Sequence, residues 1–374
     1  MQRFSLIFFI LCHFSVSFAA DYSKIDKQSA TVPTNLKTAP DITAYLIRNM
    51  TTPSEKVRAI YYWITHNIRY DVSQLKNSDI SYSYGERNLL DEVLQNRRGV
   101  CQHYSELFHA CCLSAGIKSY VISGYTKTDG QIAALSHAWN AVVIDGKFTE
   151  IDATWAAGYV TNGKFTAQFN DVYFMISPTE FIKTHIPFDP IWQFLDNPLS
   201  NKEFSTDNFS KLKTHSTYNF VDSINVSGRL DSLSKLVRQN RRIKDFGLTN
   251  DLLRNYVYRN QQNIVQLKYN QGVAEFNKAI EAYNIYIMNK NKQFNGTSME
   301  DNKVLELLAN ARSHAEFAEK KIQFLNSDNS TILKNISDIQ TLIVNLKKNI
   351  DLEDLFVEKY IKTLKPFRML LFYK

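Results

Sequence analysis

The chain has 374 residues, of which 44% are hydrophobic and 13% aromatic, so it has the length and composition for two folded domains. This composition excludes an intrinsically disordered chain. The formal charge is +7, and the excess lies in residues 228–374, where 24 Lys and Arg stand against 16 Asp and Glu. These charges are interspersed rather than grouped, which predicts solvated helix faces. A protein partner for them stays open, and no nucleic acid is expected.

Residues 1–19 have the features of a signal peptide. Arg3 precedes an apolar run from Phe4 to Leu11, and small residues lead to a predicted cleavage site after Ala19. No later apolar run reaches the roughly 18 residues of a membrane-spanning helix. We therefore expect an exported chain, periplasmic or extracellular, without a transmembrane span.

Residues 20–40 are polar and contain Pro33 and Pro40, which predicts a linker or a draped arm. Thr52-Pro53-Ser54-Glu55 predicts a helix start, because it combines a Thr cap, a Pro in the first turn and a Glu three residues after the cap. Periodic apolar residues then predict three helices, at 52–68, at 88–97 and from Cys101 to Gly116.

Strands follow these helices. β-Branched and aromatic residues predict them at 119–126, 137–144 and 147–155, and a tight Asp145-Gly146 turn joins the last two. The loop at 125–136 is expected to be a plain connection, although it could act as a lid. Helices followed by an antiparallel sheet predict an α+β domain over residues 41–200, with a short β and helix extension at its end.

The C-terminal part has a different pattern. A linker is predicted at 201–227, and an all-α domain over 228–374. Its helices are predicted at 229–242, 250–290, 299–325, 329–349 and 352–364. The roughly 34-residue period of tetratricopeptide repeats is not found, so we expect a helical bundle or an array of helical hairpins.

Three cysteines follow the predicted signal peptide. On one helix, Cys101 lies about 15 Å from Cys111 and Cys112, which is too far for a disulfide. Backbone N–H groups and the dipole at a helix start favour a thiolate, so Cys101 can be a nucleophile. A buried small residue is the alternative interpretation for Cys101, and it is the expected one for Cys111 and Cys112.

The predicted hairpin brings a histidine and a carboxylate together. A two-residue turn pairs Ile144 with Lys147, which places His137, Trp139 and Asp152 on one face of the sheet. A carboxylate beside an imidazole fixes its tautomer and stabilises its cation. With Cys101, these residues have the chain order Cys, His, acid of papain-like enzymes.

Four segments carry a family resemblance: "RRGVCQHYSELFHACCLSAGI", "HAWNAVVIDGKFTEIDATW", "NIRYD" and "YFMISPTEFIKTHIPFDPIWQFL". Their order and content resemble the transglutaminase-like superfamily of papain-type folds, and within it the kyphoscoliosis-peptidase branch. The resemblance covers about residues 40–200. It implies that Cys101 is the nucleophile, His137 the general base and Asp152 the residue that orients His137.

Three further residues are candidates near the substrate. Tyr70 could donate to the oxyanion together with the Cys101 N–H, or it could simply be packed. The family usually has a small residue where this chain has His103, so His103 is expected to narrow the pocket or contact substrate. Trp139 is expected to pack in the hairpin, or else to line the substrate groove.

The resulting prediction is a cysteine-nucleophile acyl-transfer enzyme that acts on protein amide bonds, with peptidase the favoured activity. A cross-linking transglutaminase and a non-catalytic binding or scaffold module of the cell envelope are the alternatives. No cofactor is expected, and no metal motif such as CxxC or HExxH occurs.

Overall fold

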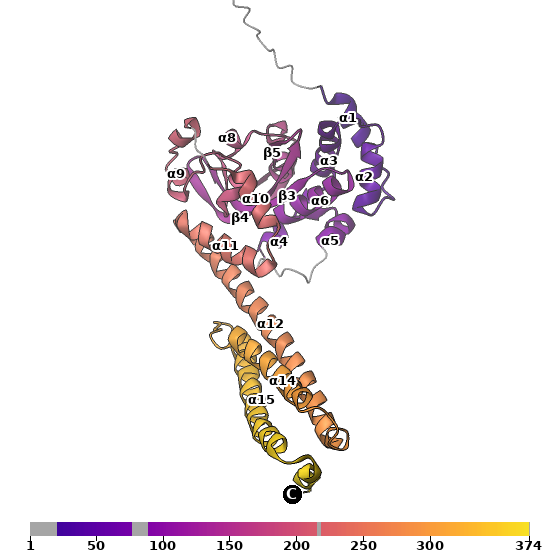
Figure 1. Cartoon of the computed structure of the whole chain (residues 1–374). Coiled ribbons are helices and arrows are strands. Elements are labelled where there is room, and N and C mark those ends of the chain that lie inside the picture. Colours follow the sequence, from indigo (N-terminus) through magenta and orange to yellow (C-terminus); the bar gives the residue numbers. More distant parts are fainter. Residues whose placement is uncertain (1–20, 77–88, 215–217, 374) are drawn as a thin grey trace, which may run out of the picture. The chain divides into compact units, whose positions relative to one another are not determined.

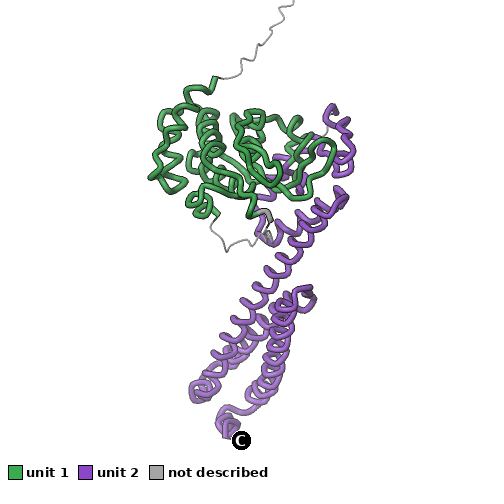
Figure 2. The backbone as a smooth tube through the Cα atoms, turned by 180° about the vertical axis from the view of Figure 1, so that it is seen from behind, with its two compact units in different colours: residues 1–187, 193–195 green, residues 188–192, 196–374 purple. Residues whose placement is uncertain are grey.

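A computed structural model describes residues 21–76, 89–214 and 218–373. The predicted signal peptide therefore lies outside the described residues. The chain divides into two compact units, shown in different colours in Figure 2. Unit 1 comprises the described residues up to Pro187 together with 193–195, and unit 2 comprises 188–192 and the described residues from Asp196 onward.

Unit 1 begins with helices rather than with a linker. The segment predicted to be a linker or arm contains α1 (Ser23–Ser29) and the start of α2 (Ala39–Ile47), and α1 packs against α3 (Pro53–Asn67). The buried Arg58 of α3 pairs with Asp26 of α1 at 2.7 Å and also with Asp171. The polar composition of this segment was misleading, because a buried arginine on another helix binds it.

An antiparallel sheet with strand order β5-β4-β3-β8 forms the centre of unit 1 (Figure 1). Its strands are β3 (Ser119–Thr128), β4 (Gln131–Ile144), β5 (Lys147–Ile151) and β8 (His185–Pro187). The expected loop at 125–136 is instead a continuation of the β3–β4 hairpin, with its turn at Asp129-Gly130. Helix α6 (Cys101–Ser114) packs against β3 and β4. The predicted α+β fold is confirmed.

The hairpin has the predicted register, with Ile144 opposite Lys147 and Asn140 opposite Ile151. The strand predicted to reach residue 155 ends at Ile151, however, because Asp152 accepts backbone N–H groups and starts α7 (Ala153–Ala157). Cys111 and Cys112 are buried in the same core as Leu107 and Val142, and neither forms a disulfide. That core lies between α6, the sheet and α3.

Shorter elements complete unit 1. They are β1 (Arg69–Tyr70), α4 (Val72–Lys76), α5 (Leu89–Asn96), β2 (Arg98–Gly99), β6 (Gly158–Thr161), β7 (Lys164–Ala167), η1 (Asp171–Tyr173) and α8 (Pro178–Phe181). β1 and β2 form a short parallel pair with Tyr70 opposite Gly99, and β6 and β7 form a second hairpin. A further short helix, η2 (Pro190–Gln193), stands where the chain passes between the two units.

Unit 2 is helical in its described residues. Its helices are α9 (Asn201–Ser205), η3 (Ser210–Lys213), α10 (Phe220–Gly228), α11 (Ser232–Asp245), α12 (Asp251–Asn291), α13 (Gln293–Gly296), α14 (Asp301–Ile322), α15 (Ser330–Lys362) and η4 (Lys365–Phe372). The segment predicted as a linker at 201–227 contains α9, η3 and all but the last residue of α10. The two helices predicted at 329–349 and 352–364 are one, α15, since residues 350–351 contain no helix breaker.

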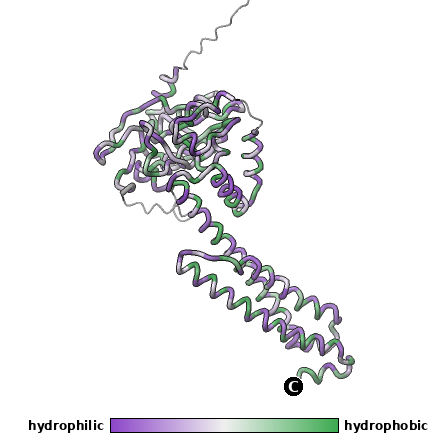
Figure 3. Tube along the Cα trace, turned by 90° about the vertical axis from the view of Figure 1, so that its left-hand side faces the viewer, coloured by the Kyte–Doolittle hydropathy of each residue, from purple (hydrophilic) through white to green (hydrophobic). Residues whose placement is uncertain are grey.

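Three long helices, α12, α14 and α15, lie side by side in unit 2 (Figure 1). Hydrophobic and hydrophilic residues alternate along them in Figure 3, as expected for amphipathic helices that share one core. A Cβ on Gly272 of α12 would lie 2.3 Å from Cγ1 of Ile322, so α12 and α14 are in close contact there. Within the described residues, no helix has the length and apolar character needed to cross a membrane.

Candidate active site

Cys101 is the first residue of α6 and is only 7% exposed. The preceding residue, Val100, has extended backbone geometry and serves as the helix N-cap. Its N–H donates to Nδ1 of His103 at 3.2 Å. His103 therefore replaces the Glu or Gln of a capping box, because its side chain accepts a hydrogen bond from the backbone N–H of the N-cap residue. This bond fixes the turn that presents Cys101.

The structure places His103 inside the protein, and its predicted role toward substrate stays a prediction. His103 is 3% exposed, and both of its ring nitrogens are engaged inside the protein. Because Nδ1 accepts the Val100 N–H, the ring proton is on Nε2, which lies 3.3 Å from a carboxylate oxygen of Glu92 in α5. A Cβ on Gly99 would lie 2.5 Å from Cβ of His103, so a glycine is needed where the ring packs.

His137 and Asp152 form a buried pair. Nε2 of His137 lies 2.7 Å from Oδ2 of Asp152. Burial opposes the charged imidazolium, but the charge and hydrogen bond of Asp152 outweigh it and raise the pKa of His137 to about 10. An imidazolium is thus the favoured form of His137 at neutral pH.

The Asp152 carboxylate accepts four hydrogen bonds. Oδ1 accepts the backbone N–H groups of Thr154 and Trp155 at 2.8 and 3.0 Å, as the N-cap of α7. Oδ2 accepts from His137 and from His185. Burial alone would raise the pKa of Asp152, but His137 and the other donors hold it below its usual range. Asp152 is therefore an anion, and its orientation is fixed on both oxygens.

Cys101 acts on the same imidazole, because its side chain lies near enough to His137 to raise the pKa of that ring further, through hydrogen bonding and charge. Since Nε2 of His137 contacts Asp152, Nδ1 is the ring nitrogen that remains for the thiol. Cys101, His137 and Asp152 thus form a continuous chain of contacts across α6, β4 and the end of β5. A thiol, an imidazole and a carboxylate in this order can carry out nucleophilic attack on an acyl group.

The model of the family described as "Transglutaminase-like superfamily" matches residues 40–153.

Residues 40–153 belong to the transglutaminase-like superfamily.

Unit 1 contains these residues and is here called the transglutaminase-like domain. The mouse kyphoscoliosis peptidase is 32% identical to this chain over 200 residues, which are 51% of this chain and 29% of that protein. Drosophila melanogaster hillarin is 27% identical over 207 residues, 49% of this chain and 24% of hillarin. The chain thus spans less than a third of these curated relatives. The crystal structure of a TGase is 18% identical, with a TM-score of 0.26 over 43% of this chain and 38% of that one.

His185 is the residue of the transglutaminase-like domain that the sequence did not single out. It lies on β8, and its Nε2 is 3.2 Å from the same Asp152 oxygen that His137 contacts. Its pKa is lowered to about 4, because burial outweighs the influence of Asp152. His185 is therefore neutral at physiological pH. The motif that contains it was recognised, but strand β8 was not, and only the pairing of β8 with β3 brings it to the site.

Trp139 does not line a groove, contrary to one of its two predicted roles. It is 1% exposed, and its Nε1 donates to Glu150 at 3.1 Å. Burial raises the pKa of the Glu150 carboxyl well above its usual range. A Cβ on Gly124 would lie 2.4 Å from the Trp139 indole, so the ring passes over a glycine on β3. Trp139 therefore packs in the hairpin beneath the site.

The pairing of β1 with β2 brings Tyr70 near the nucleophile. Tyr70 pairs with Gly99, two residues before Cys101, and its half-buried ring is near those of Tyr104 and Phe165, with centroids 6.5 and 6.3 Å away. The structure thus places Tyr70 beside the start of α6. Its role toward an oxyanion stays a prediction.

One group of described side chains has the spacing of metal ligands, and it coincides with this site. The ligand atoms of His137, Asp152 and His185 all lie within 4.8 Å of one another. Two imidazoles and a carboxylate are suitable ligands for zinc or iron. However, the hydrogen bonds that both histidines donate to Asp152 already explain why these three side chains lie so close together. The influence of Cys101 on His137 indicates acyl transfer rather than metal binding.

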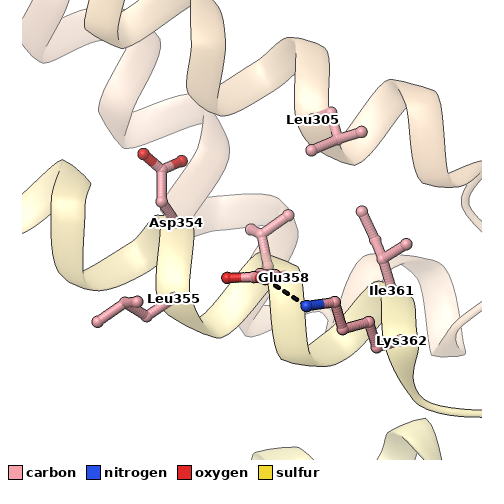
Figure 4. A pocket seen from close by; sticks show the side chains of 7 residues that line it. Leu305, Asp354, Leu355, Glu358, Ile361 and Lys362 are labelled. Carbon is pink, nitrogen blue, oxygen red and sulfur yellow. Dashed lines mark hydrogen bonds and ion pairs between the residues drawn. The ribbon is translucent and has the colours of Figure 1, made fainter.

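A groove lies in unit 2, between α14 and α15 (Figure 4). It is lined by Leu305, Asp354, Leu355, Val357, Glu358, Ile361 and Lys362. Glu358 and Lys362 form an ion pair within it. The lining of this groove includes no cysteine, serine or histidine, so it offers neither a nucleophilic side chain nor an imidazole that could act as a general base. The candidate active site is therefore that of the transglutaminase-like domain.

Proposed function

We propose that the transglutaminase-like domain is a cysteine peptidase that acts on protein or peptide substrates outside the cytoplasm. The observation that carries this proposal is the chain of contacts from Cys101 through His137 to Asp152. The peptidase names of relatives at 32% identity support it. Export rests on the signal-peptide features of residues 1–19 alone.

The first half of the reaction forms an acyl-enzyme. The Cys101 thiolate attacks the carbonyl carbon of a substrate amide, and the carbonyl oxygen becomes an oxyanion. The N–H of Cys101, which precedes the first intrahelical hydrogen bonds of α6, can donate to that oxyanion, and Tyr70 is a candidate second donor. The His137 imidazolium then gives its proton to the amine, which leaves, and a thioester remains on Cys101.

The second half releases the acyl group. His137 is now neutral and accepts a proton from water as the water attacks the thioester carbonyl. The carboxylic acid leaves, and the thiolate–imidazolium pair of Cys101 and His137 is restored. If a substrate amine attacks instead, the same steps give an amide cross-link, as in a transglutaminase. The two outcomes therefore differ only in the second nucleophile.

Digestion of a peptide library tests this proposal. We expect the wild-type protein to cleave peptides, and Cys101→Ala, which keeps the fold but lacks the thiol, to cleave none. A parallel incubation with a glutamine-containing peptide and a primary amine, read by mass spectrometry, covers the alternative. A mixed amide product would contradict the peptidase proposal and establish transamidation. Equal cleavage by wild type and Cys101→Ala would exclude Cys101 as the nucleophile.

A further inference from the structure

Two histidines donate to one oxygen of Asp152. His137 and His185 lie 2.7 and 3.2 Å from Oδ2, with ring centroids 5.7 Å apart. Cys101 acts on the pKa of His137, whereas the groups that act on the pKa of His185 are Asp152 and His137. The two rings therefore have different roles: His137 lies next to the nucleophile, and His185 contacts the carboxylate from strand β8.

The proton arrangement of His185 follows from its neighbours. Nδ1 lies 2.8 Å from the hydroxyl of Thr184. A neutral imidazole carries one N–H, and the Asp152 carboxylate can only accept, so that proton is on Nε2. Nδ1 then accepts the hydroxyl proton of Thr184. Asp152 thus sets the tautomer of His185, and Thr184 satisfies Nδ1 on the opposite side of the ring.

The His185 ring is held firmly. It stacks on Phe181 with centroids 4.1 Å apart and packs against Trp155 at 4.5 Å. Its backbone pairs with Thr126 of β3. The ring is 1% exposed, so water has little access to its hydrogen bond with Asp152. A donor this tightly packed can limit the movement of the carboxylate that it contacts.

We propose that His185 is a positioning residue for the triad: its Nε2–H, aligned by Thr184, fixes Oδ2 of Asp152 toward His137. This proposal rests on the proposed function. A neutral donor suits the task, because it orders the carboxylate without cancelling the negative charge that stabilises the His137 imidazolium. An arginine or lysine in its place would compete with His137 for that charge.

Two substitutions separate the hydrogen bond from the packing. His185→Gln places an amide N–H near the position of Nε2, whereas His185→Met fills a similar volume without a donor. The readout is the rate at which iodoacetamide alkylates Cys101, which requires no substrate. We expect His185→Met to reduce this rate roughly 10- to 100-fold at neutral pH, as loss of a supporting hydrogen bond does, and His185→Gln to restore most of it.

A second pair keeps the proposal testable if His185→Met does not fold. Thr184→Val removes the hydroxyl that binds Nδ1 of His185, and Thr184→Ser retains it. We expect Thr184→Val to slow alkylation and Thr184→Ser to be close to wild type. The low-field NMR signal of the His137 Nε2 proton, a direct report on its bond to Asp152, should shift in Thr184→Val and in His185→Met only.

The outcomes are distinct. Alkylation of His185→Met at the wild-type rate would overturn the positioning role, and so would a His185→Gln variant as slow as His185→Met, since packing would then explain the loss. If wild-type Cys101 itself reacts no faster than an ordinary thiol, the proposed function fails instead. Urea unfolding of each variant verifies that the domain is intact.

Discussion

Replacement of Asp152 by Asn tests the electrostatics of the candidate site most sharply. Asn has nearly the same shape as Asp, so no cavity forms. Its amide oxygen can still accept the N–H groups of Thr154 and Trp155, and α7 keeps its cap. Its amide nitrogen, however, cannot accept the protons of His137 and His185. The variant therefore removes the negative charge and preserves the local fold.

The size of the effect on folding stability follows from the pKa of His137. Its pKa is about 10, against 6.5 for an ordinary imidazole, because Asp152 outweighs the burial. A group with a raised pKa stabilises the folded state fully below its unfolded pKa, and this stability is lost as the pH rises through the folded pKa. Between pH 6.5 and 10, wild type should lose roughly 5 kcal/mol from this group. In Asp152→Asn only burial and the smaller influence of Cys101 remain, so the pKa of His137 should fall strongly and most of this loss should vanish.

Urea unfolding between pH 6.5 and 10, followed by tryptophan fluorescence, measures this difference. Three of the four tryptophans, Trp63, Trp139 and Trp155, lie in unit 1, so the signal reports mainly on that unit. Asp145→Asn is the matched control, because Asp145 is exposed in the β4–β5 turn at a positive φ of 49° that Asn accommodates. If wild type and Asp152→Asn lose stability equally across this range, the proposed coupling does not exist.

Three further predictions concern the fold that supports the site. Gly99→Ala should destabilise unit 1 by about 1–3 kcal/mol and slow alkylation of the nucleophile, since the new Cβ would meet His103; an unchanged alkylation rate would refute this. Arg58→Ala should cost about 1–3 kcal/mol in urea unfolding, because the buried arginine side chain is lost from between α1 and η1 and the partly exposed Asp26 loses its partner; an unchanged stability would contradict it. Gly272→Ala should lower the melting temperature of unit 2 although Ala favours helices, because its Cβ would meet Ile322; a higher melting temperature would disprove the close contact.

The local sequence pattern was sufficient to predict helix α6, which begins with the nucleophile, and the β4–β5 hairpin. The Asp145-Gly146 turn set the pairing of β4 with β5, and strand alternation then placed His137 and Asp152 on one face. The end of β5 was missed because an Asp after a strand can also cap a helix, and this one does both through its two oxygens. The same residue thus ends the strand and orients the base.

Long-range contacts explain what pattern could not reveal. His185 reaches the site because β8 pairs with β3, and no local signal specifies that partner. His103 was assigned to substrate because it follows the nucleophile, yet its position three residues after the cap of α6 is that of a capping-box side chain. Helix α1 resembled a linker because its partner, Arg58, lies on a different helix. For His185 and helix α1 the missing information was a contact between distant segments, whereas for His103 it was a local cap that a histidine seldom provides.

The most direct test of the central claim is the alkylation rate of Cys101 by iodoacetamide near neutral pH, measured by peptide mass spectrometry. Cys111 and Cys112, whose thiols have pKa values raised by burial, are internal controls that should stay unlabelled in the folded protein. We expect wild-type Cys101 to react much faster than a model thiol and His137→Ala to abolish the advantage. A Cys101 that reacts no faster than the model thiol, with no change in His137→Ala, would contradict the enzyme account and favour a non-catalytic binding module.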